Sequence, residues 1–123
     1  MGFRIDAKTE SEWRARGIIV DARQFVAPIE ERVSEKEFQA AVVSLAKRNG
    51  WRVYHTHDSR KSEAGFPDLV MVRAGRLIIA ELKAASGKVA AAQQNWIDDL
   101  RSCGLDVRVW RPSDWKAIVE VLT

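Results

Sequence analysis

Two acidic residues, Asp68 and Glu81, stand at the ends of a segment whose pattern predicts a β-hairpin. Ala74-Gly75 is the only turn signal between them, and β-forming residues flank it on both sides. A two-residue turn there places Arg73 opposite Arg76, and the same register brings Asp68 opposite Glu81. Opposed residues of an antiparallel pair have Cβ atoms about 4.5–5.5 Å apart, so the two carboxylates should converge.

A converging pair of carboxylates points to metal chemistry. Like charges so placed repel each other, whereas a divalent cation that prefers oxygen ligands removes the conflict. Lys83 follows Glu81 by two residues, so it projects from the same face of the strand. Two acids and one amine presented together are suited to metal-dependent cleavage of a phosphodiester bond.

The motifs, taken in order, resemble the PD-(D/E)XK nuclease signature and, within that superfamily, the VRR-NUC domain. The matching pieces are Glu37, Gly65-Phe66-Pro67-Asp68-Leu69-Val70, Glu81-Leu82-Lys83, Gln93 and Trp96. The resemblance spans residues 34–122. It implies a restriction-endonuclease-like α/β fold and a Mg²⁺- or Mn²⁺-dependent nuclease of DNA. It further implies repair, recombination or phage nucleic-acid processing, with branched or flapped DNA as substrate.

The resemblance gives the matching residues their roles. Asp68 and Glu81 are expected to hold the metal together with the backbone carbonyl of Leu82. Lys83 is expected to orient the attacking water and to help neutralise the phosphate, for which a compact ammonium charge is suited.

Glu37 and Gln93 complete the expected catalytic set, and each has a competing structural explanation. Glu37 would bind a second metal or a water of the first, but Ser34 and Glu37 also have the spacing of a capping box, and Glu35 is the alternative acid. Gln93 would orient the phosphate or Lys83, but a glutamine on an apolar helix stripe also needs a hydrogen-bond partner. Its neighbour Gln94 aligns with the polar face. Both alternatives stay open.

Other polar residues are candidates for contact with the nucleic acid. Arg60 and Lys61 precede Gly65 in a polar loop and could bind phosphates, with a solvated charge run as the equal alternative. His55 and His57 share a strand face, but zinc is disfavoured because no cysteine or third histidine lies nearby. The expected DNA-binding set is His57, Arg60, Lys61 and Lys88.

Hydrophobic periodicity predicts the elements that position these residues. Helices are expected over residues 34–50, 89–103 and 112–122, and strands over 51–56, 68–73, 76–81 and 105–110. The order α-β-β-β-α-β-α predicts an α/β fold with a mixed β-sheet flanked by helices on both faces. The second helix is expected to bury four side chains, namely Val89, Trp96, Leu100 and Cys103.

Length and composition limit the number of domains and the class of protein. The 123 residues fit one domain, with an N-terminal arm over 1–33 and the nuclease domain over 34–123. No apolar run reaches the about 18 residues of a membrane span, and the N-terminus lacks the shape of a signal peptide. One cysteine suits a reducing cytoplasm, expected to be that of a bacterium or a phage-infected cell. The net charge of +3 permits a polyanionic partner without requiring one.

Two further interpretations belong to other classes of protein. A non-catalytic nucleic-acid-binding module on a nuclease scaffold would have lost an acid or the lysine, whereas this chain carries the full motif. A metal-stabilised structural protein is disfavoured because Lys83 would crowd the cation without benefit. A nuclease this small has little room for a separate recognition domain, so a homodimer is expected.

Overall fold

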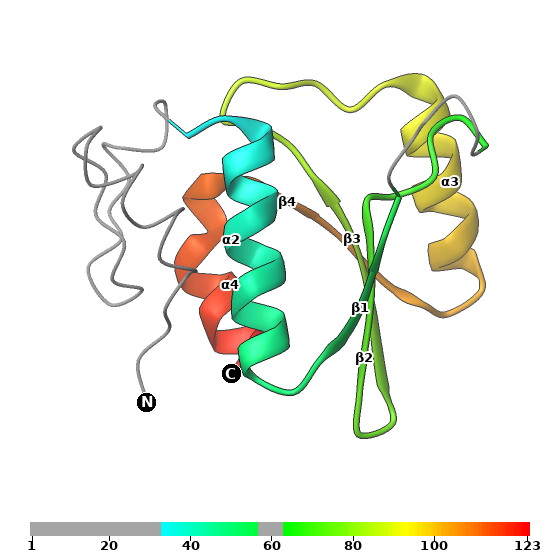
Figure 1. The fold of residues 1–123 in the computed structure, drawn as a ribbon. Helices are drawn as coiled ribbons and strands as arrows, with labels where there is room; N and C mark the ends of the chain where they lie inside the picture. The colour runs from blue at the N-terminus through cyan, green and yellow to red at the C-terminus, as the bar shows by residue number, and fades with distance from the viewer. Residues whose placement is uncertain (1–32, 57–62) are drawn as a thin grey trace.

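The computed structural model describes residues 33–56 and 63–123, which form one four-stranded sheet with helices on both faces (Figure 1). The strands are β1 (Arg52–His55), β2 (Leu69–Arg73), β3 (Arg76–Leu82) and β4 (Asp106–Trp110), which lie in this order across the sheet. The first three are antiparallel neighbours, and β4 pairs with β3 in parallel. The predicted mixed sheet is confirmed.

The described helices are α2 (Glu35–Arg48), α3 (Ala91–Ser102) and α4 (Trp115–Leu122), with the short 3-10 helix η2 (Pro112–Asp114) leading into α4. Figure 1 shows α2 and α4 side by side on one face of the sheet and α3 on the other. None of the helices in the described part of the chain is long and apolar enough to cross a membrane.

The two sheet faces bury different cores because successive strand residues point to opposite sides. Leu69, Met71 and Ile78 point toward α2 and α4 and belong to the larger core. On the opposite face, Ile79 and Val107 pack against Ile97 of α3 in a smaller core.

The β2–β3 hairpin has the register expected from its turn. Arg73 pairs with Arg76 and Val70 pairs with Ile79. Ala74 and Gly75 have φ values of 48° and 80°, as a two-residue turn of the favoured hairpin type requires. The ladder extends to Leu69 opposite Ala80, one step short of Asp68 and Glu81.

The buried face of α3 differs from the prediction. Ile97 is the fully buried residue of this helix, whereas Trp96 is only half-buried and Cys103 is exposed. Cys103 is the C-cap, where the chain leaves the helix, so the apolar stripe does not continue through it. The buried face of α3 is therefore centred on Ile97, one residue after Trp96, and Val89 and Leu100 pack beside Ile97.

Candidate active site

Asp68 and Glu81 meet where β2 begins and β3 ends. The Glu81 side chain is 1% exposed and is the one charged side chain buried among residues 33–56 and 63–123. Asp68 is half-buried, and its Oδ2 accepts a hydrogen bond from the Leu82 N–H at 2.8 Å. The two carboxyl groups lie close enough to share a hydrogen bond. The cross-strand convergence expected from the register is therefore present.

The environment of Glu81 disfavours its ionised form. Burial, followed by the hydrogen bond with Asp68 and the charge of Asp68, raises the pKa of Glu81 from 4.5 to about 9. The positive charge of Lys83 acts in the opposite direction. The Oε2 atom of Glu81 is buried and has no hydrogen-bond partner within the described residues.

This pair of acids fits a hard divalent cation. A buried carboxylate without a partner is costly, and a cation between the two side chains would supply the missing charge and ligation at once. Within the described ranges, no three His, Cys, Asp or Glu side chains are grouped as a metal site. A two-carboxylate donor set suits Mg²⁺, which keeps several waters and takes few protein ligands.

Lys83 lies directly after β3, and the end of β4 holds its backbone. Its N–H donates to the Trp110 carbonyl at 3.0 Å. The next residue after Trp110, Arg111, donates from Nη1 to the carbonyl of Ala84 at 2.9 Å. Arg111 therefore fixes the chain on the far side of Lys83. Sequence reasoning missed it, because no local pattern links two residues 27 positions apart.

The two candidate third acids, Glu37 and Glu35, lie in the first turn of α2, at the end of the sheet where β3 ends (Figure 1). Glu37 forms the predicted capping box: its N–H donates to Ser34 Oγ, and its Oε1 accepts from the Ser34 N–H, both at 3.1 Å. Glu35 is exposed, and its charge is among those that raise the pKa of Glu81.

Gln93 lies in the first turn of α3 and is half-buried. Its Oε1 accepts a hydrogen bond from the Ala90 N–H at 2.8 Å, so the oxygen stabilises the start of the helix. Its amide nitrogen has no hydrogen-bond partner among the described residues and is the end that a substrate could contact. The Nε2 of Gln94 donates a hydrogen bond to Asp98 Oδ1 at 2.8 Å on the polar face of α3, as the spacing of the two residues suggested.

The loop before Asp68 packs tightly on the start of α3. Gly65 has φ +88°, and a Cβ atom there would lie 2.5 Å from the backbone carbon of Ala92. Phe66 contacts Trp96 edge to face, with ring centroids 5.1 Å apart. These contacts explain why the Gly65-Phe66 and Trp96 pieces of the motif occur together, since they set the position of Asp68 relative to α3.

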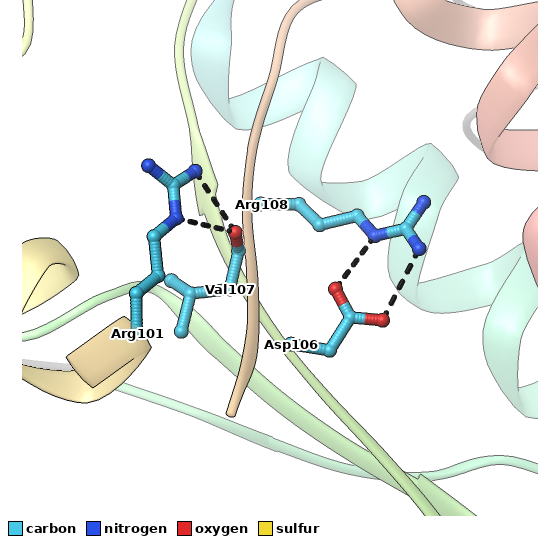
Figure 2. A network of polar contacts seen from close by, with 4 residues as sticks. All are labelled: Arg101, Asp106, Val107 and Arg108. Atoms are coloured by element: carbon cyan, nitrogen blue, oxygen red, sulfur yellow. Dashed lines mark hydrogen bonds and ion pairs between the residues drawn. The ribbon is translucent and has the colours of Figure 1, made fainter. Parts of the chain in front are cut away.

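The other end of α3 is tied to the edge of the sheet. Arg101 donates from Nε and Nη2 to the Val107 carbonyl of β4, at 3.0 and 2.9 Å (Figure 2). On the other side of the same strand, Arg108 holds Asp106 with two hydrogen bonds of 2.8 and 3.1 Å. Asp106 and Arg108 are each about one-third exposed, so their ion pair adds little stability, whereas the Arg101 contact fixes the helix that carries Gln93.

Of the four predicted DNA contacts, Lys88 lies in the described part of the chain. His57, Arg60 and Lys61 lie outside the described residues. Lys88 is exposed in the connector between Lys83 and α3.

Comparisons with known proteins bear on the family and the fold of this chain. The family model of the VRR-NUC domain matches residues 10–114. A solved structure described as a VRR_NUC domain protein has a TM-score of 0.58 at 23% identity, over 72% of this chain and 84% of that one. Another, described as a VRR_NUC domain, has a TM-score of 0.61 at 20% identity, over 72% of this chain and 96% of that one. No curated protein matches the sequence. The match over most of the chain shows that this protein belongs to the VRR-NUC family of nuclease-type domains.

Proposed function

We propose that this protein is a Mg²⁺- or Mn²⁺-dependent nuclease of DNA whose reaction takes place at Asp68 and Glu81. The observation that carries the proposal is the buried Glu81, which lies against a second acid with one carboxyl oxygen unsatisfied. Such an arrangement destabilises the fold unless a bound cation compensates it. Buried acids with strongly shifted pKa values are common at functional sites.

Each residue of the site has a distinct part in phosphodiester hydrolysis. Asp68 and Glu81 would hold the cation, together with the Leu82 carbonyl. When bound, the cation supplies a Lewis acid that neutralises charge on the phosphate and makes water more acidic. Lys83 orients the attacking water and adds a positive charge beside the phosphate. Water adds to phosphorus, one P–O ester bond breaks, and the leaving oxygen takes up a proton.

For the third acid, the first-turn geometry favours Glu35 over Glu37. The carboxylate of Glu37 already completes the capping box, whereas the charge of Glu35 reaches Glu81 without such an engagement. The amide nitrogen of Gln93 would contact the phosphate while its oxygen caps α3.

Cleavage assays on labelled linear, flap, fork and four-way-junction DNA, with Mn²⁺ or with EDTA, test the proposal. We expect Mn²⁺-dependent cleavage, with branched or flapped substrates preferred, and its loss in Asp68→Asn. Lys83→Ala should cut cleavage by orders of magnitude while DNA affinity stays within a few-fold, because one lost phosphate contact changes the salt slope by only about one unit. Binding without cleavage of any substrate would instead indicate a non-catalytic nucleic-acid-binding module.

A further inference from the structure

The turn end of the β2–β3 hairpin, opposite to the acids, carries a cationic surface pocket of about 490 Å³. Figure 1 shows this turn at the far end of the sheet from the connector that follows Lys83. Among the residues that the structure describes, the lining combines arginines with apolar strand residues and includes no acidic residue; it contains Arg52, Val72, Arg73, Arg76 and Leu77. We call it the hairpin-end pocket.

Arg73 is held in place before any ligand arrives. Its Nη1 donates to the carbonyls of Asn49 and Leu122 at 2.9 and 3.0 Å, and its guanidinium lies 4.6 Å from the ring centroid of Trp51. The Nε and Nη2 hydrogens of this guanidinium have no partner among the described residues. A fixed guanidinium with remaining donors in its planar fork is pre-organised for an oxyanion.

Arg52 and Arg76 are exposed, and neither forms an ion pair with any residue that the structure describes. The charge of Arg76 contributes to lowering the pKa of Asp106, but that carboxylate is paired with Arg108 at 2.8 Å. The pocket therefore holds positive charge that its acidic neighbour leaves largely uncompensated.

We propose that the hairpin-end pocket binds a backbone phosphate of the nucleic acid, away from the bond that is cut. Asp68 and Arg73 are five residues apart along extended chain, roughly 17 Å at about 3.4 Å per residue. Arg52, Val72 and Leu77 share the sheet face of Asp68 and Glu81 by strand alternation. Arg73 and Arg76 alternate to the opposite face, so one strand of polyanion would pass from the acids to Arg52 and reach the other two arginines around the end of the hairpin. The inference rests on the proposed function, because the phosphate belongs to the same substrate.

The salt dependence of binding tests the pocket. A labelled DNA duplex is titrated in EDTA with wild type, with Arg52→Gln/Arg76→Gln and with the control Lys116→Gln, which changes an exposed residue of α4. We expect the slope of log K against log salt to fall by about one unit in the double variant, since the one phosphate that the pocket would hold contributes about 0.9. Affinity should fall about tenfold or more, and the control should keep the wild-type slope. Arg73 is left intact because it also holds the fold.

The same proteins assayed for cleavage in Mn²⁺ separate this inference from the proposed function. Wild-type cleavage combined with an unchanged slope in the double variant would overturn the pocket and leave the nuclease proposal standing. A reduced slope in the double variant, with no cleavage by wild type, would support the pocket and count against the nuclease. Light scattering that shows a wild-type dimer and a monomeric double variant would assign the surface to an interface between two copies and overturn the phosphate site.

Discussion

At the scale of single residues, Glu81 shows the conflict between stability and function most clearly. A carboxylic acid inside the sheet must either keep a proton against its ordinary pKa or carry a charge without solvent. Both options cost free energy in the metal-free protein. Natural proteins tolerate such costs at active sites, where removing the costly group stabilises the fold and abolishes activity.

Glu81→Gln should therefore raise the melting temperature in EDTA by several degrees, corresponding to on the order of 1 kcal/mol or more, while abolishing cleavage. Wild type should melt higher with millimolar Mn²⁺ than with EDTA, because a ligand that binds only the folded state stabilises it. The variant should lose this shift. Thermal melts of both proteins, with exposed Glu120→Gln as the control, measure the effect. A variant less stable than wild type in EDTA would contradict the strain assigned to Glu81.

Two substitutions in the first turn of α2 decide the third acid. Glu37→Gln keeps the capping box, because glutamine also serves at that position, so the fold should stay intact. We expect Glu35→Gln to lower the cleavage rate by orders of magnitude and Glu37→Gln to lower it only a few-fold. Single-turnover rates with saturating enzyme report the chemical step. If Glu37→Gln lowers the cleavage rate more than Glu35→Gln does, then Glu37 is the third acid as well as the partner of Ser34 in the capping box.

At the scale of the elements, the site depends on how the loop before β2 meets α3. Gly65 allows the loop backbone to lie against the backbone of Ala92, and Phe66 and Trp96 close the contact from the side. The Arg101 bonds to Val107 hold the other end of the same helix. The helix that carries Gln93 is therefore fixed at its start to the loop before β2 and at its end to β4.

Gly65→Ala should destabilise the protein by on the order of 1–3 kcal/mol and reduce cleavage beyond the loss of folded protein. The added Cβ would lie 2.5 Å from the Ala92 backbone, so the loop must shift and carry Asp68 with it. Gly104→Ala is the matched control, because Gly104 also has a positive φ of 80° but no atom within 4 Å of the new Cβ. Equal losses of activity in the two variants, at a temperature where both are folded, would show that the contact with α3 does not position Asp68.

At the scale of the whole molecule, Arg73 joins the sheet to the ends of two helices. It donates to the carbonyl of Asn49, the C-cap of α2, and to that of Leu122, the last residue of α4. Trp51 donates to the same Leu122 carbonyl at 2.9 Å. Carbonyls at helix C-termini lack intrahelical partners and carry partial negative charge. The Arg73 guanidinium, which donates to one carbonyl at each helix end, therefore stabilises both ends.

Arg73→Met should lower the free energy of unfolding by about 1–3 kcal/mol, because it leaves the Asn49 carbonyl without this donor and weakens the tie to α4. Arg76→Met is the control. Arg76 lies over the same Trp51 ring at 5.9 Å, but it is exposed and forms no hydrogen bond to a described residue, so its loss should stay within about 0.5 kcal/mol. Urea denaturation measures both variants. Equal effects would mean that stacking on Trp51, rather than the two carbonyls, stabilises this corner.

The sequence determined the features that depend on neighbours along the chain. Strand alternation and the Ala74-Gly75 turn set the hairpin register, and with it the meeting of Asp68 and Glu81. The spacing of Ser34 and Glu37 determined the cap of α2. These features were predictable because turn chemistry, strand periodicity and capping act within a few residues.

Only the tertiary structure decided the features that depend on packing between distant segments. Packing of the folded chain sets the burial of Glu81, and thereby its raised pKa. The docking of α3 on the sheet selected Ile97 rather than Trp96 as its buried residue. The Arg111 contact with Ala84 and the Arg73 contacts with two helix ends join residues far apart in sequence, so no local pattern encodes them. A side chain's solvent exposure and hydrogen-bond partners depend on the elements that pack around it, and these elements come together only in the folded tertiary structure.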